Sequence, residues 1–263
     1  MTDRFCIDTQ IYDSVDLPVE VQFENIAKAG FKNVFFSIKE IHDGSAFPEI
    51  AKAARAAGLR IVNVHLPFRS NELFWLEGEE RQARLEKFYK YIDIVGGVGG
   101  VESVVIHPTA GEDNLYVSDI GTDSFKKLCK RAAKYNMDVC IENLRAREHL
   151  DWLFEKVNEP NLKFVHDTGH EVAFTKGTDH LKYFGKHLGF THIHDNDGIS
   201  DLHLIPGKGV IDLKTVMSKY HKLGYNGYLS LEVCVWPKYF PDKEEHLQYV
   251  KEAFNAITAM NIY

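Results

Sequence analysis

Residues 132–143 read AAKYNMDVCIEN, a segment that holds the end of an amphipathic helix, a turn, an apolar run and a final carboxylate, Glu142. Asn136 is suited to ending a helix, and the run 137–142 has the apolar and β-branched residues of a buried strand. The same order of helix end, apolar run and polar residue recurs along the whole chain. The segment is therefore one unit of a repeated helix–strand pattern.

Eight such apolar runs predict eight strands, separated by helical patterns such as 19–29 and 247–259. The runs are 5–8, 31–36, 59–65, 101–107, 137–142, 162–167, 190–194 and 225–232. Strands that alternate with helices imply right-handed crossovers and a parallel sheet, and eight units imply closure of that sheet. We therefore expect residues 1–263 to form a single domain of the α/β class, a (β/α)8 TIM barrel.

An open, doubly wound sheet is the alternative architecture. It fits less well because no GxGxxG motif follows the first strand. The glycine-rich run 96–100 precedes a predicted strand and does not open a helix, so we interpret it as a helix-to-strand turn.

The composition describes an acidic globular protein with a formal charge of −7 and a sequence pI of about 6.0. Such a chain lacks the positive field that binds a phosphate backbone, which makes nucleic acid an unlikely partner. The N-terminus has no secretory signal pattern, and no apolar run approaches the roughly 18 residues that would span a bilayer. The four cysteines form no CxxC pair. These features predict a cytoplasmic protein with reduced thiols.

Residues able to bind metal stand at the ends of six consecutive predicted strands, where a barrel gathers side chains at one mouth. They are His65, His107, Glu142, Asp167 with His170 just beyond it, His192 with His194, and Glu232, and the loop after the seventh strand adds Asp201 and His203. A lone histidine at a strand end is usually a hydrogen-bonded core or rim residue. Glu142 and Glu232, however, each end a strongly apolar strand, and an unpaired buried carboxylate is costly. Divalent metal ions would account for all of these positions together.

The ordered set of motifs resembles the xylose-isomerase-like TIM-barrel superfamily, which includes sugar isomerases, sugar epimerases and endonuclease IV. The motifs are His65-Leu-Pro, Ile106-His107-Pro108, Ile141-Glu142-Asn143, His166-Asp167-Thr168-Gly169-His170, His192-Ile-His-Asp195, Asp201-Leu-His203 with Gly207-Lys208-Gly209, and Leu231-Glu232. The resemblance covers nearly the whole chain.

The resemblance implies two different metal contents. In the epimerases and isomerases one divalent ion, often manganese, is held at positions that match Glu142, Asp167, His192 and Glu232. Endonuclease IV holds three zinc ions, and by resemblance His65 and His107 with bridging Glu142 would form one further site. His170, Asp201 and His203 would form the other. Because this chain has all nine residue types, we expect divalent ions, zinc in particular, up to three of them, with manganese as the alternative.

Two reactions follow from these two metal contents. Adjacent ions activate water and stabilise both oxygens of an in-line displacement, so the sequence favours a hydrolase of a small phosphoester or sugar phosphate. The alternative is a one-metal sugar or sugar-phosphate isomerase or epimerase, in which Glu142 and Glu232 are the catalytic acid and base. A metal-binding barrel without catalytic activity is a third hypothesis.

The surroundings of the predicted site bear on the substrate, which we expect to be a small phosphorylated or sugar molecule. Candidates for contacting a phosphate are Arg69, Arg145, Arg147 and Lys208, while Phe68, Phe74 and Trp75 would either cover the ligand or pack within their loop. Asp201 stands where epimerases of this group tend to carry an arginine. His194 is expected to orient a metal ligand from behind. The sequence does not indicate the substrate's identity or the oligomeric state.

Overall fold

Eight parallel strands form one sheet in the computed structural model, which describes residues 2–9, 17–39, 43–110, 116–234 and 243–260. The strands are β1 (Phe5–Asp8), β2 (Asn33–Ser37), β3 (Arg60–His65), β4 (Ser103–Ile106), β5 (Asp138–Glu142), β6 (Leu162–Asp167), β7 (Leu188–His192) and β8 (Leu229–Leu231). Neighbours in sequence are neighbours in the sheet, and β1 also pairs with β8. A parallel bridge between Ile193 and Leu231 joins the end of β7 to β8. The sheet is therefore the closed barrel that the sequence predicts, and the open-sheet alternative is wrong.

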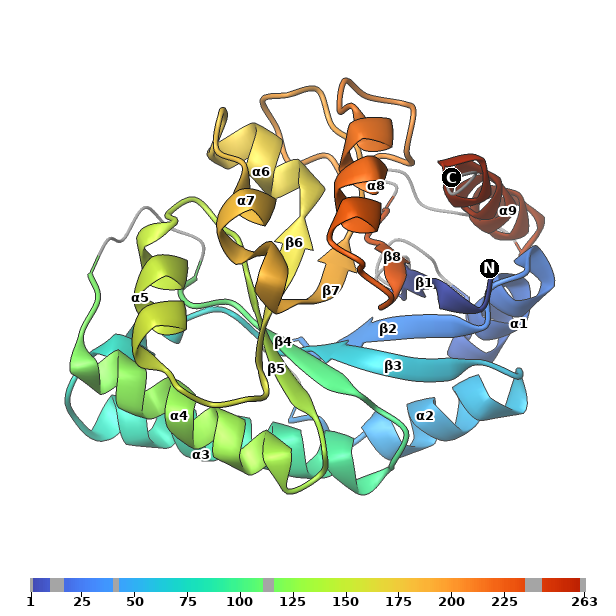
Figure 1. The fold of residues 1–263 in the computed structure, drawn as a ribbon. Coiled ribbons are helices and arrows are strands. Elements are labelled where there is room, and N and C mark those ends of the chain that lie inside the picture. The colour runs from blue at the N-terminus through green and yellow to red at the C-terminus, as the bar shows by residue number, and fades with distance from the viewer. Residues whose placement is uncertain (1, 10–16, 40–42, 111–115, 235–242, 261–263) are drawn as a thin grey trace.

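Helices surround this barrel, and those that connect its strands alternate with them along the chain (Figure 1). Within the described residues the α-helices are α1 (Val19–Ala29), α2 (Phe47–Ala56), α3 (Glu79–Gly97), α4 (Asp119–Ala133), α5 (Glu148–Lys156), α6 (Thr168–Phe174), α7 (His180–Phe184), α8 (Leu213–Lys222) and α9 (Lys243–Met260). Short 3-10 helices span Thr2–Arg4, Asn71–Trp75 and Gly185–His187. The last helix, α9, packs against the first, α1, so the two ends of the chain meet on one side of the molecule.

Some predicted boundaries move. Strand β8 begins at Leu229 and not at 225, and ahead of it the Tyr225 hydroxyl donates to the carbonyl of Tyr228. Helix α3 continues to Gly97, and Gly99 and Gly100 then take φ of 68° and 84°, left-handed values that favour glycine. The glycine-rich run is thus the helix-to-strand connection that the sequence predicts.

The interior of the barrel is filled by one apolar layer beneath its mouth. This layer contains Cys6, Phe35, Val62, Val105, Cys140, Val165 and Phe190, one residue from each of β1 to β7. A larger apolar cluster lies between the strands and the helices. All four cysteines are free thiols.

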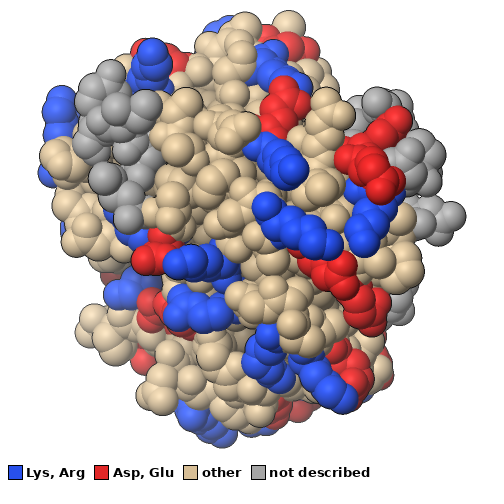
Figure 2. Space-filling model, turned by 90° about the vertical axis from the view of Figure 1, so that its right-hand side faces the viewer, with Lys and Arg blue, Asp and Glu red and all other residues tan. Residues whose placement is uncertain are grey.

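The surface carries both signs of charge. On the face that includes the right-hand side of Figure 1, basic and acidic side chains are interspersed over the described residues, without a broad field of one sign (Figure 2). None of the described helices has both the length and the apolar composition needed to cross a membrane.

Candidate metal centre

The period of the strands places the predicted ligands in the barrel mouth. Successive side chains of a strand point to opposite faces, so a residue two positions beyond an interior residue also points inward. Four predicted ligands stand two positions after a residue of the interior apolar layer: His107 after Val105, Glu142 after Cys140, Asp167 after Val165 and His192 after Phe190. In the barrel these four side chains therefore form a polar layer next to the apolar layer.

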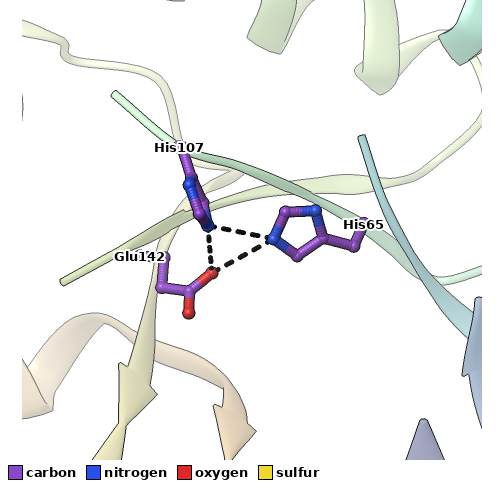
Figure 3. A group of neighbouring side chains, drawn as sticks. All are labelled: His65, His107 and Glu142. Atoms are coloured by element: carbon purple, nitrogen blue, oxygen red, sulfur yellow. Dashed lines mark hydrogen bonds and ion pairs between the residues drawn. The ribbon is translucent and has the colours of Figure 1, made fainter. Parts of the chain in front are cut away.

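His107 and Glu142 form a compact group with His65 at the ends of β3, β4 and β5 (Figure 3). The Nε2 atoms of His65 and His107 are 3.0 Å apart, and Glu142 Oε2 lies 3.3 Å and 3.0 Å from them. All three residues are buried. Because His65 Nδ1 donates to the carbonyl of Leu66 at 2.9 Å, its Nε2 is the nitrogen left to bind a cation.

Glu142 also belongs to a second group, with Asp167, His192 and Glu232, whose possible ligand atoms all lie within 4.8 Å of one another. His192 Nδ1 is 3.0 Å from Glu142 Oε1 and 3.3 Å from Glu232 Oε2, so two carboxylates flank one imidazole. The His192 ring is held from behind by stacking on Phe35, with ring centroids 4.9 Å apart. All four residues of this central group are buried.

A third group lies on the other side of the mouth and differs in membership from the sequence prediction. It consists of His194, Asp201 and His203, again with ligand atoms within 4.8 Å of one another. The predicted member His170 touches this group, with Nε2 3.2 Å from Asp201 Oδ2, while its Nδ1 donates to the carbonyl of Asn143 at 3.0 Å. His194, expected only to orient a ligand, has its Nε2 3.1 Å from Asp167 Oδ1 and 3.6 Å from Asp201 Oδ1.

The charges within the mouth shift the pKa values of its groups in opposite directions. Burial would raise the pKa of Glu142, but His192 and His107 outweigh it and hold that pKa well below its usual range. Burial raises the pKa of Glu232 well above its usual range, with Glu142 adding to the effect against the opposing charge of His203. Burial likewise lowers the pKa of His107 to about 4. The two carboxylates that flank His192 thus differ strongly in their affinity for a proton.

The pKa values of two further histidines are raised. Burial alone would lower their pKa values, but nearby carboxylates outweigh it. Asp167 and Asp201 raise the pKa of His170 to about 10, and Asp201 with Glu232 raises that of His203 to about 10. In the absence of a cation, protons on these rings neutralise the carboxylates.

The residues present fit a divalent cation. Within the described residues, Glu142, Asp167, Asp201 and Glu232 make ion pairs only with histidines, and no lysine or arginine neutralises them. Glu232 Oε2 is buried and accepts no hydrogen bond from a described residue. Mixed imidazole and carboxylate ligands suit several divalent metals, among them zinc and manganese.

The candidate phosphate-binding residues are spread more widely than the sequence suggested. Lys208 pairs with Glu252 on α9, and Arg147 pairs with Asp151 on α5. Arg145 lies over the ring of Phe174, and Arg69 is exposed. The structure does not gather these four cations into one phosphate site.

Of the aromatic residues in the β3–α3 loop, two pack inside the fold and one borders the barrel mouth. Phe74 and Trp75 are buried, and Trp75 Nε1 donates to the carbonyl of Pro108, so both pack within the fold and do not cover a ligand. Phe68 is 42% exposed, and its ring stacks on His107 with centroids 4.7 Å apart. Of the three candidates, only Phe68 borders the mouth.

Sequence reasoning missed Asp8 and left the partners of Asp195 unspecified, and both residues shape this site. Asp8 ends β1 two positions after the interior residue Cys6, is buried, and adds to the raised pKa of Glu232. The rule that found Glu142 applies equally to Asp8. Asp195 accepts hydrogen bonds from the backbone N–H groups of Asn196, Gly207, Gly209 and Ile211, and so holds the loop that carries Asp201 and His203. The glycine motif at 207–209 was visible in the sequence, but its partner was not.

Proteins with related sequences include fructoselysine 3-epimerase of Escherichia coli O157:H7, which is 26% identical over 144 residues, or 51% of this chain and 52% of that enzyme. Inosose dehydratase of Geobacillus thermodenitrificans (strain NG80-2) is 26% identical over 139 residues, or 43% of this chain and 46% of that enzyme. The chain spans about half the length of the curated relatives it matches.

The fold is shared with D-psicose 3-epimerase from Clostridium cellulolyticum H10, at a TM-score of 0.74 and 17% identity over 98% of both chains. None of these three proteins is named as a phosphoester hydrolase or a nuclease. Residues 23–256 match the family described as the xylose isomerase-like TIM barrel, and the chain belongs to that family.

Proposed function

We propose that this protein is a metal-dependent sugar epimerase or isomerase that uses Glu142 and Glu232 as its acid–base pair. The observation that carries the proposal is the convergence of these two buried carboxylates on one atom, Nδ1 of His192, at 3.0 Å and 3.3 Å. The names of the related proteins favour this activity over the phosphoester hydrolysis that the sequence alone suggested.

The central group of Glu142, Asp167, His192 and Glu232 would hold one divalent cation. When bound, such an ion polarises the carbonyl and adjacent hydroxyl oxygens of a ketose and so makes the neighbouring C–H bond more acidic. Zinc has no support over manganese from the geometry, because the ligand types accept both.

The two carboxylates divide the proton transfer between them. Glu142, whose pKa is lowered by His192 and His107 despite its burial, is the base that removes a proton from carbon. Glu232, whose pKa is raised by burial, is the acid that returns a proton to the other face of that carbon. In the reverse reaction the two residues exchange roles.

Phosphoester hydrolysis is a second candidate because of one observation. His65, His107 and Glu142 form a separate group within hydrogen-bond distances, and a one-metal epimerase has no evident need for it. Metal there, next to a cation in the central group, would give the paired ions of an in-line displacement.

Exchange of carbon-bound hydrogen in D2O tests the proposal. Protein loaded with Mn²⁺ is incubated with D-fructose, D-psicose, D-tagatose or L-ribulose, and deuterium on carbon is followed by NMR. We expect Glu142→Gln and Glu232→Gln each to lower the exchange rate by about 10²- to 10⁴-fold, the usual contribution of a general acid or base. Glu102→Gln, an exposed carboxylate that precedes β4, is the control and should exchange like the wild type.

The outcomes separate the candidates. Deuterated epimer supports the proposal, and loss of water after exchange would indicate a dehydratase that uses the same two carboxylates. Release of phosphate from small phosphoesters without any exchange on ketoses, lost on His65→Ala, would refute the epimerase in favour of the hydrolase.

A further inference from the structure

Two arginines follow β5 within three residues of each other, and each lies over an aromatic ring. Arg145 has its guanidinium carbon 3.9 Å from the centroid of Phe174, and Arg147 has the same carbon 4.4 Å from the centroid of Tyr183. A planar guanidinium that stacks on a ring keeps the N–H donors at its edge available.

The two arginines differ in how those donors are used. Arg147 Nε donates to Asp151 Oδ2 at 2.9 Å, so its charge is already neutralised by a carboxylate of α5. Arg145 makes no ion pair and no side-chain hydrogen bond with any described residue, and it is exposed. Arg145 is therefore a positioned cation whose donors are open to a ligand.

Ring stacking connects Arg145 to the metal centre. Phe174, half-buried at the end of α6, stacks on His170 one helical turn earlier, with centroids 5.1 Å apart and planes 27° from parallel. His170 in turn lies 3.2 Å from Asp201 at the centre. The chain of contacts Arg145–Phe174–His170 thus runs from the rim of the mouth to the centre.

We propose that Arg145 binds an anionic group, a phosphate or a carboxylate, on the part of the substrate remote from the carbon that reacts. The fork of N–H donors matches the oxygens of either anion. The metal centre beside it is rich in carboxylates, so an anion would find its favourable partner at this rim position and not deeper in the mouth. The inference rests on the proposed function, and it makes the substrate an acidic sugar derivative.

Binding of unreactive polyols tests the proposal without turnover. Calorimetric titrations of the Mn²⁺-loaded protein compare D-glucitol, D-glucitol 6-phosphate and D-gluconate. We expect at least one of the two anions to bind more tightly than D-glucitol, and Arg145→Gln to remove that advantage, weakening the anion by about 10- to 100-fold, as for a lost hydrogen bond to a charged group. Affinity for D-glucitol should not change. Arg147→Gln is the matched control and should retain the advantage.

Several outcomes would overturn the proposal. They are equal affinity of the wild type for all three polyols, an anion advantage that survives in Arg145→Gln, and an equal loss for all three ligands. The second of these outcomes would mean that the anion binds at the metal itself. Which of the two anions gains affinity identifies the acidic group.

A parallel exchange experiment separates this proposal from the proposed function. Suppose that no ketose exchanges deuterium, but an anionic polyol binds more tightly than D-glucitol and Arg145→Gln removes that advantage. This result would refute the epimerase alone. Exchange on neutral ketoses, without an anion advantage that Arg145→Gln removes, would refute the anion site alone.

Discussion

Gly169 leaves the space that the ring of His194 occupies. A Cβ atom on Gly169 would lie 1.9 Å from Cε1 of His194, whose Nε2 is 3.1 Å from Asp167 Oδ1. Gly169→Ala should push this ring away from Asp167 and lower Mn²⁺ affinity by about 10- to 100-fold, the usual effect of disturbing a partner of a metal ligand. Gly97→Ala, where a Cβ would meet no atom within 4 Å, is the control. Equal Mn²⁺ affinity of both variants in calorimetric titrations would contradict this role.

Protons and metal compete for the same residues. Burial raises the pKa of Glu232, so a proton competes with a cation for this carboxylate more than it does at Glu142. We expect protons to be released when Mn²⁺ binds, with affinity that rises with pH, and a smaller release in Glu232→Gln. Titrations in two buffers of different ionisation enthalpy measure the number of protons released. Heats of binding that are independent of the buffer would contradict the prediction.

The same titration shows how many of the candidate metal-binding groups hold an ion. The pKa of His170 and that of His203 are raised to about 10, so both rings are protonated at pH 7 without metal. Metal bound at Asp201 would release these protons as well. A release that Glu232→Gln abolishes therefore indicates a single ion in the central group, and a release that persists in this variant indicates further ions.

At the scale of elements, the loop between β7 and α8 depends on one buried carboxylate. Asp195 accepts four backbone N–H groups at 2.9–3.0 Å, and hydrogen bonds to a charged group contribute about 1.5–3 kcal/mol each. Asp195→Asn replaces one acceptor oxygen by a donor that faces these N–H groups. We expect amide hydrogen exchange across residues 196–212 to accelerate at least tenfold while the barrel strands stay protected. Glu102→Gln, an exposed carboxylate outside this loop, should leave exchange near the wild-type rate.

The strands and the loop also differ in how far sequence predicts them. Alternation along a strand is a local rule, so the inward positions of Glu142, Asp167 and His192 followed from the apolar residues two positions earlier. The same rule covers Asp8, two positions after Cys6 on β1. Asp195 obeys no local rule, because its partners lie up to 16 residues away and are brought back by a turn in which Gly207 has φ of 87°.

For the whole molecule, the barrel gathers buried charged side chains from many strands at its mouth, next to the interior apolar layer. The candidate ligands come from β3 to β6, from the ends of β7 and β8 and from the loop after β7, and the apolar layer lies beneath them. A cation bound there would join strands that are distant in sequence, so its free energy of binding adds to the stability of the closed barrel.

Removal of metal should therefore lower the stability of the fold. The effect of Glu232→Gln on Tm should have opposite signs with and without metal. At a Mn²⁺ concentration 100 times Kd the stabilisation is about 2.7 kcal/mol, which for a chain of this length corresponds to a fall in Tm of about 5–10 °C on chelation. Glu232→Gln removes a ligand but also a buried carboxylate that repels Glu142 and Asp167. We expect this variant to have a lower Tm than the wild type with metal and a higher Tm without it. Thermal unfolding with and without chelator measures all four values, with Glu102→Gln as the control that should follow the wild type. A lower Tm of Glu232→Gln in both conditions would mean that the carboxylate is held by the protein itself and not by a cation.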